Sequence, residues 1–164
     1  MYSVYLGLGS NLGDREKMLA SAVEGLKEQV EITAVSPIYE TAAWGVVDQP
    51  DFLNMCVAGK TELEPLALLA FVKELEVRLG RKPTKRWGPR EIDIDILLYE
   101  GLVVRSEKLD VPHKGMAERA TVLIPLADIA PDLVHTISGK TVAQLLAEVD
   151  RSGVLPYPST SQAE

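Results

Sequence analysis

The sequence has little cysteine, no long hydrophobic run and a deficit of positive charge. The one cysteine, Cys56, excludes an internal disulfide and predicts a reducing compartment, the cytoplasm. No apolar run approaches the roughly 20 residues that a membrane-spanning helix needs, and the N-terminus lacks the basic start of a signal peptide. We therefore expect no membrane association. A length of 164 residues predicts one domain, residues 1–150, followed by a flexible polar tail, residues 151–164.

Positive charge is scarce overall but concentrated in one segment. The chain has 17 Lys and Arg against 24 Asp and Glu, a net charge of −7, which argues against a nucleic-acid partner. The segment from Arg78 to Arg90 nevertheless holds six basic residues and no acid. Asp93 and Asp95 follow it inside the apolar run IDIDILLY. A cationic loop that leads into a strand with paired carboxylates suits a metal-bound polyphosphate.

The apolar periodicity predicts an α+β domain. Helices with one buried face are expected at residues 14–30, 65–80, 122–129 and 141–149. Strands are expected at 4–8, 52–61 and 92–99, with an extended segment at 32–39 that Pro37 breaks and an edge hairpin at 103–111. The last two do not fit a regular series of parallel βαβ units. The pattern therefore favours an α+β sandwich with a mostly antiparallel sheet over a doubly wound parallel sheet.

Asp93 and Asp95 are the best candidate metal ligands. Residues two apart on a strand point the same way, with Cβ atoms roughly 6–7 Å apart. Two such carboxylates could bridge a pair of magnesium ions, which prefer oxygen ligands. The alternative is that both face solvent on a half-exposed strand. Aspartate is a poor strand former, so two of them in an apolar run favour a functional role.

The basic segment contains three arginines that could pair with phosphate oxygens, Arg81, Arg86 and Arg90. The alternative is a solvated surface loop, against which Trp87 argues. The prolines and glycine of this segment suggest discrete conformers, as in a lid that closes over substrate.

Other motifs are weaker. Gly7, Gly9 and Gly13 are spaced one residue too widely for a dinucleotide fingerprint, so we expect a strand-to-helix turn there. His113 could contact phosphate or be structural, and we take His135 to be structural. Phe52 and Asn54 alternate on one strand and could together hold a flat heterocycle.

The segment RWGPREIDIDILLY at residues 86–99 resembles the signature of 6-hydroxymethyl-7,8-dihydropterin pyrophosphokinases. GLGSNLGD at 7–14, SPIYET at 36–41, DQPDFLN at 48–54 and VPHKGMAERATVLIPL at 111–126 follow in that family's order. The resemblance implies a ferredoxin-like α/β/α sandwich that acts in folate biosynthesis as a monomer or weak homodimer. It also implies two Mg²⁺ ions and ATP as co-substrate, with pyrophosphate transferred to the pterin and AMP released.

The same resemblance implies roles for individual residues. Catalysis would use Arg81, Arg90, Asp93 and Asp95, and the two aspartates would hold the metal ions. ATP would contact Glu76, Arg86, Trp87, Ile96, Lys108, Asp110, His113 and Arg119. The pterin would contact Thr41, Ala42, Trp44, Phe52 and Asn54.

The sequence departs from the family pattern in the implied pterin pocket. Thr121 stands where the family usually has an aromatic that stacks on the pterin, and Trp44 replaces an aliphatic residue. We hypothesise that Trp44 compensates. Two other functions stay open: a different Mg-dependent nucleotide enzyme, which would release ADP or phosphate, and a non-catalytic module that binds nucleotide or pterin.

Overall fold

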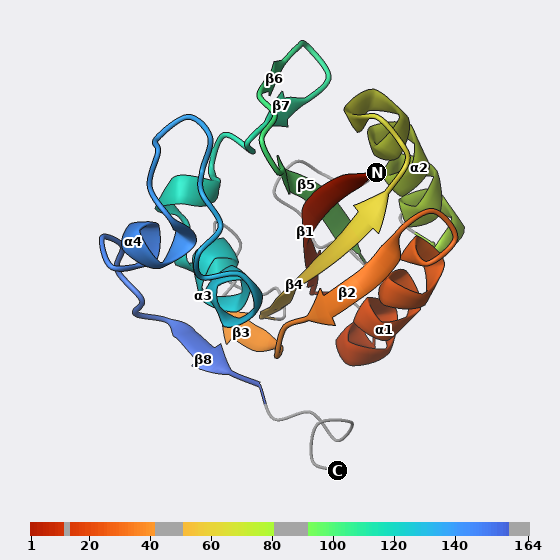
Figure 1. Ribbon diagram of the computed structural model, residues 1–164. Helices are drawn as coiled ribbons and strands as arrows, with labels where there is room; N and C mark the ends of the chain where they lie inside the picture. The colour runs from red at the N-terminus through yellow and green to blue at the C-terminus, as the bar shows by residue number, and fades with distance from the viewer. Residues whose placement is uncertain (12–13, 42–50, 81–91, 158–164) are drawn as a thin grey trace.

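The computed structural model describes residues 1–11, 14–41, 51–80 and 92–157. Figure 1 shows the order of the elements along the chain. They are β1 (Tyr2–Ser10), α1 (Arg15–Leu26), β2 (Glu31–Val35), β3 (Tyr39–Thr41), β4 (Phe52–Thr61), α2 (Pro65–Arg78), β5 (Asp93–Tyr99), β6 (Val104–Arg105), β7 (Asp110–Val111), the 3₁₀ turn η1 (Met116–Glu118), α3 (Ala120–Ile129), α4 (Val142–Leu146) and β8 (Val154–Pro156).

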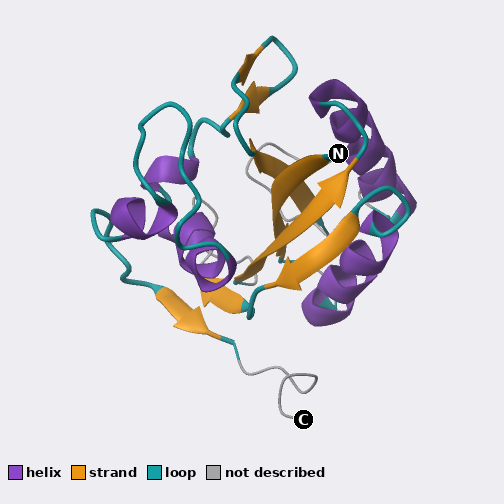
Figure 2. Cartoon of the chain, viewed as in Figure 1, coloured by secondary structure: helices purple, strands orange, loops and turns teal. Residues whose placement is uncertain are grey.

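Six strands form the main sheet in the order β5-β1-β4-β3-β8, with β2 also paired to β4 (Figure 2). All pairings among the described strands are antiparallel, which confirms the predicted sheet type. β2 and β3 lie one after the other along the same side of β4, because Pro37 between them lacks the N–H that a continuous ladder needs.

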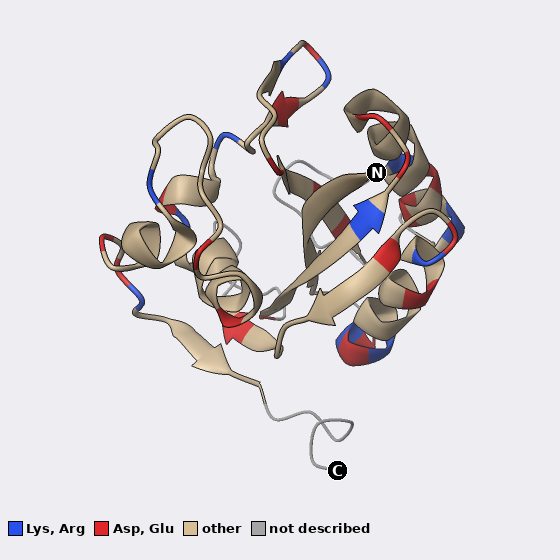
Figure 3. Cartoon of the chain, in the orientation of Figure 1, with Lys and Arg blue, Asp and Glu red and all other residues tan. Residues whose placement is uncertain are grey.

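Helices cover both faces of this sheet. α1 and α2 enclose the larger core on one face, where the alternating residues Leu6, Leu8 and Ile94 are buried. α3 and α4 cover the other face through a second core that includes Leu97, Met116 and Leu123. In Figure 3, positions of charged residues of both signs are frequent along the ribbons of α1 and α2, whereas α3 carries few.

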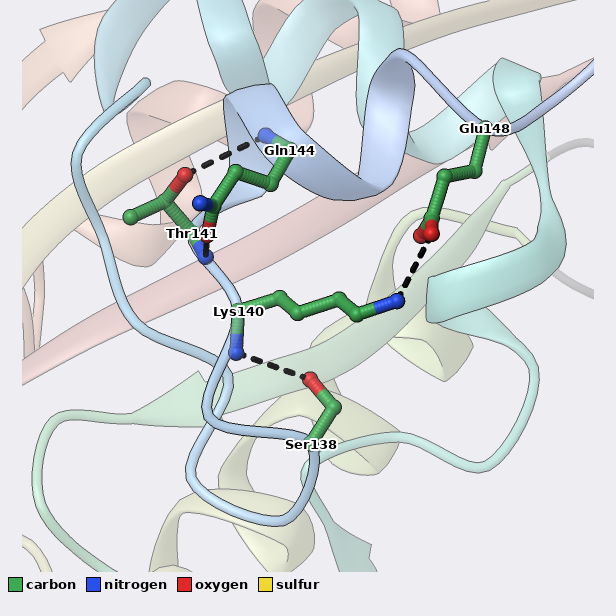
Figure 4. A network of polar contacts seen from close by, with 5 residues as sticks. All are labelled: Ser138, Lys140, Thr141, Gln144 and Glu148. Atoms are coloured by element: carbon green, nitrogen blue, oxygen red, sulfur yellow. Dashed lines mark hydrogen bonds and ion pairs between the residues drawn. The ribbon is translucent and has the colours of Figure 1, made fainter.

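Several expected elements differ from the prediction in the structure. α1 begins after the N-cap Asp14 as predicted, but it ends at Leu26, where tighter turn bonds replace helical ones. α4 is shorter than expected, although Thr141 caps it in a reciprocal pair of bonds with Gln144 (Figure 4). The hairpin at 103–111 exists, but β6 and β7 form a separate two-stranded sheet.

The segment after residue 150 contains an unexpected strand. β8 pairs with β3, with Thr41 opposite Val154, so part of the stretch expected to be a flexible tail extends the sheet. Pro156 fits there because β8 is an edge strand. The division into one domain and a tail stays a prediction. No helix among the described residues is long and apolar enough to cross a membrane.

Candidate active site

β5 presents Asp93 and Asp95 on the face opposite its buried isoleucines, as the alternating pattern predicted. Ile94 and Ile96 are 1% and 3% exposed and pack toward α2, whereas Asp93 is half-buried and Asp95 is exposed. The two carboxylates therefore share one face at the edge strand of the sheet.

The glycines of β1 lie next to these aspartates, not in a turn. Gly9 pairs with Asp93 on one side and Asn54 on the other, and Gly7 pairs in the same way with Asp95 and Cys56. The expected strand-to-helix turn is therefore wrong for Gly9, because β1 continues to Ser10, whereas Gly7 lies within the strand expected at residues 4–8. Two strand positions without side chains leave space between the carboxylates of β5 and the amide of β4.

Gly9 fits closely against Asn54. A Cβ atom at Gly9 would lie 3.1 Å from Asn54 Oδ1, whereas one at Gly7 would lie 3.4 Å from the methyl groups of Leu97. Asn54 Nδ2 in turn donates to Thr41 Oγ1 at 3.1 Å, which fixes the orientation of the amide. The absence of a side chain at Gly9 thus leaves Asn54 Oδ1 accessible from the β1 side.

A small cavity lies over these residues. Its lining comes from β1, β4, β5 and the start of α3: Gly7, Leu8, Gly9, Phe52, Asn54, Met55, Cys56, Asp93, Asp95, Leu97, Thr121 and Val122. The structure therefore brings the predicted metal ligands together with Phe52 and Asn54. Thr121, the residue that departs from the family pattern, borders the same cavity.

A β-bulge shapes the floor of the cavity. The register between β1 and β5 shifts between Tyr5 and Leu6, so that Leu97 is an extra residue on β5. Leu97 and Leu98 are consequently both buried in the core below α3. Sequence reasoning missed this bulge, since an uninterrupted apolar run gives no sign of it.

Glu76, on α2, accepts a hydrogen bond from the main chain of β5. Its side chain is 2% exposed, and Oε2 accepts the Ile94 N–H at 2.7 Å, between the two aspartates in sequence. Oε1 lies 3.4 Å from Lys73 Nζ. β5 is an edge strand, so an N–H that points away from β1 needs such a partner. The predicted contact of Glu76 and Ile96 with ATP stays a prediction, and for buried Ile96 it would involve mainly the main chain.

The other predicted ATP residues within the described ranges, Lys108, Asp110, His113 and Arg119, lie around β7 and the start of α3. The His113 N–H donates to Leu97 O at 2.8 Å, which joins this segment to β5. His113 Nδ1 accepts the Gly115 N–H at 3.2 Å, and the Arg119 guanidinium lies against Gly115, where a Cβ would be 2.7 Å from its Cζ. Asp110 lies 3.7 Å from Lys114, and Lys108 is exposed. His113 and Arg119 are thus brought together around one glycine.

Six predicted site residues lie outside the described residues: Ala42, Trp44, Arg81, Arg86, Trp87 and Arg90. Within the described ranges, no group of three or more His, Cys, Asp or Glu side chains could hold a metal ion. Magnesium bound by one or two carboxylates together with substrate phosphates does not need such a group. The two aspartates therefore suit a metal that arrives with a nucleotide.

The cavity contains no activated nucleophile among its described residues. Cys56 is 1% exposed, and burial, followed by the negative charge of Asp128, raises the pKa of its thiol. Tyr39 is the register partner of Asn54 on the neighbouring strand. Burial and a hydrogen bond to Asp128 raise the pKa of Tyr39 to about 12. Both groups stay protonated near neutral pH, so carboxylates and a polar amide define the chemistry of the site.

Comparisons with known proteins match this description. The family model for 7,8-dihydro-6-hydroxymethylpterin-pyrophosphokinase matches residues 5–131. The chain is 52% identical over 156 residues to 2-amino-4-hydroxy-6-hydroxymethyldihydropteridine pyrophosphokinase of Methylorubrum extorquens, covering 94% of this chain and 98% of that protein. It is 45% identical over 148 residues to the enzyme of the same name from Aquifex aeolicus, covering 90% of this chain and 92% of that protein.

A solved structure supports the fold. A triple mutant of Plasmodium falciparum HPPK-DHPS with pteroate superposes with a TM-score of 0.72 at 16% identity, covering 90% of this chain and 43% of that longer chain. Such low identity bears on the fold alone. The match over most of the sequence decides the family: this chain belongs to the 7,8-dihydro-6-hydroxymethylpterin-pyrophosphokinases and is an enzyme of that class.

Proposed function

We propose that this chain transfers the terminal two phosphates of ATP to 6-hydroxymethyl-7,8-dihydropterin, in a Mg²⁺-dependent step of folate biosynthesis in the cytoplasm. The observation that carries this proposal is the position of Asp93 and Asp95. They share one sheet face with Asn54, across the two β1 positions that lack side chains. A metal-bound polyphosphate and a flat heterocycle could meet there.

In the proposed reaction, the hydroxymethyl oxygen of the pterin attacks the β-phosphorus of ATP. The bond from that phosphorus to the oxygen bridging the α- and β-phosphates breaks, AMP leaves with the bridging oxygen, and the hydroxyl proton is lost. Asp95, exposed toward the cavity, is proposed to help accept this proton. Two bound Mg²⁺ ions would neutralise phosphate charge.

The chain's other residues would orient the two substrates. Asn54, held by Thr41, would read the amide edge of the pterin, and Phe52 would contact its ring. His113 and Arg119 would bind ATP phosphates from the segment joined to Leu97. By family resemblance, Arg81 and Arg90 would stabilise the transferring charge.

We further propose that the fold is the ferredoxin-like sandwich and that the protein is a monomer or weak homodimer. The order β1-α1-β2-β4-α2-β5 along the chain is a βαββαβ series, and these strands lie as β5-β1-β4-β2 in the sheet. The pair α3 and α4 would complete the third layer.

Phosphorus NMR of nucleotides incubated with the protein, Mg²⁺ and 6-hydroxymethyl-7,8-dihydropterin tests the proposal. We expect AMP and a pterin diphosphate, formed only when the pterin is present. ADP would instead indicate ordinary phosphoryl transfer. If both ligands bind and no product forms, the chain is a binding module, an outcome for which Thr121 at the cavity would be the first residue to test.

A further inference from the structure

Arg15, the first residue of α1, holds together the two chain segments that carry the proposed pterin residues. Its Nη1 donates to Glu40 Oε2 at 2.8 Å and to the main-chain oxygen of Asp51 at 2.7 Å. One guanidinium nitrogen carries two hydrogens, so it can make both bonds at once. Glu40 lies on β3 and Asp51 directly precedes β4, so Arg15 crosslinks the two strands where their ladder begins.

These contacts lie next to the substrate-facing residues. Glu40 precedes Thr41, Asp51 precedes Phe52, and Thr41 and Phe52 are register partners. Thr41 also accepts the hydrogen bond that orients Asn54. A separation of the two strand ends would therefore change the position of Thr41, and through it the amide of Asn54.

The C-terminal segment holds the Arg15 side chain. The Tyr157 ring centroid lies 5.7 Å from Arg15 Cζ, which is cation–π distance. The Tyr157 N–H donates to Ile38 O at 2.9 Å, and the preceding strand β8 pairs with β3. In Figure 1, β8 lies beside β3 at the edge of the sheet. Tyr157 is thus anchored to the residue that directly precedes β3, the strand that carries Glu40 and Thr41.

Partial burial distinguishes this ion pair from a pair that is exposed to solvent. The side chains of Arg15 and Glu40 are 22% and 33% exposed, whereas those of the surface pair Lys27 and Glu24 are 53% and 71% exposed. Water and salt screen a partly buried pair less, and the hydrogen bond from a guanidinium to a carboxylate is strong.

We propose that Arg15 is a positioning residue for pterin binding and that Tyr157 keeps its guanidinium in place. This inference rests on the proposed function. Arg15 acts through Glu40 and Asp51, on the β3–β4 side of the cavity. The proposed ATP residues His113 and Arg119 follow β7, a segment that is joined to β5 instead. The pterin and ATP steps should consequently respond differently to substitution of Arg15.

Steady-state kinetics of Arg15→Gln tests the proposal. We expect the KM for the pterin to rise about tenfold, as the loss of a charge-assisted hydrogen bond predicts, while kcat and the KM for MgATP stay within about twofold. Arg15→Lys should restore part of the loss, because an ammonium group keeps the charge but lacks the fork of donors. An unchanged pterin KM, or an equal rise in both KM values, would overturn the proposal.

Substitutions of Tyr157 test the proposal that its ring keeps the Arg15 guanidinium in place. Tyr157→Ala should raise the pterin KM by about threefold, while Tyr157→Phe should match the wild type, because it keeps the ring and the main-chain bond. Leu155→Ala is the matched control, since its exposed side chain lies in β8 and the substitution leaves the backbone pairing with β3 in place. Equal effects of Tyr157→Ala and Leu155→Ala would remove Tyr157 from the proposal.

Two further measurements keep the inference independent of folding and of the proposed reaction. If Arg15→Gln fails to fold, Glu40→Gln keeps a neutral acceptor and should raise the pterin KM in the same direction by a smaller factor. Fluorescence titration of the pterin measures its affinity without turnover. A wild type that binds pterin but forms no AMP would contradict the proposed function, while the ratio of the affinities for wild type and Arg15→Gln would still decide the role of Arg15.

Discussion

The carboxylate of Glu76 accepts the main-chain N–H of Ile94 at 2.7 Å, so a buried acid on α2 fixes the strand residue between Asp93 and Asp95. Glu76→Ala removes this acceptor and leaves a buried N–H unpaired. We expect a loss of about 1–3 kcal/mol of unfolding free energy. Urea denaturation, with the midpoints compared at an unchanged slope, measures it.

Lys73→Ala provides the control for Glu76. Lys73 is 55% exposed and lies 3.4 Å from Glu76, so its removal should change stability by no more than about 0.5 kcal/mol. Equal losses in the two variants would mean that the ion pair, and not the bond to Ile94, stabilises β5.

The sequence predicted the strand that carries the aspartates because a period of two in IDIDI specifies which face each residue occupies. The same period in LGLGS could have placed Gly7 and Gly9 on a strand face. Glycine is also common in turns, however, and we ended the expected strand at residue 8 and interpreted Gly9 as the start of a turn. The local sequence pattern therefore could not distinguish a strand from a turn at Gly9. The structure shows a strand, in which glycine leaves space beside Asn54.

The contacts of Arg15 could not be predicted from the sequence. Its two partners are 25 and 36 positions away, and no local period relates them. The strand β8 was missed for a different reason, because a polar segment with prolines is typical of a fraying end. Its pairing depends on β3, an edge that exists only after the rest of the sheet has formed.

Asp95→Ala should abolish most of the activity while it preserves the fold. Asp95 is exposed, so the substitution removes no packing and should leave stability unchanged within about 0.5 kcal/mol. If the carboxylate holds metal and accepts the proton, AMP formation should fall roughly a hundredfold or more. The measurement is the rate of AMP formation across a series of Mg²⁺ concentrations. Substantial activity in this variant would contradict the two-carboxylate site.

Gly9→Ala and Gly7→Ala form a matched pair on the same face of β1. The new Cβ at Gly9 would lie 3.1 Å from Asn54 Oδ1, so the amide must shift, whereas at Gly7 it would meet the methyl groups of Leu97 at 3.4 Å. We expect Gly9→Ala to raise the pterin KM several-fold and Gly7→Ala to raise it less than about twofold. Circular dichroism checks that both variants fold. A larger effect at Gly7 would show that the space beside Asp95 matters more than the position of Asn54.

His135 should make the protein less stable in mild acid. Its side chain is 7% exposed, Nδ1 accepts the Ser138 N–H at 3.0 Å, and burial lowers the pKa of the imidazole below its usual 6.5. The unfolded chain therefore binds a proton at a higher pH than the folded protein does. The contribution of His135 to stability is complete above about pH 7 and is lost as the pH falls through 6.5 toward the folded pKa, with a slope of at most about 1.4 kcal/mol per pH unit.

His135→Gln should flatten this dependence, because the amide oxygen of glutamine can accept the Ser138 N–H and does not titrate. The measurement is the free energy of unfolding by urea at pH values from 5 to 8. Lys140→Gln is the control: it removes the 2.7 Å ion pair between Lys140, in the same loop as His135, and Glu148, which follows α4 (Figure 4), but it keeps the bond between Ser138 and His135. It should retain the wild-type slope. If the two variants changed the slope alike, the loop's surface charge, and not the buried imidazole, would be its cause.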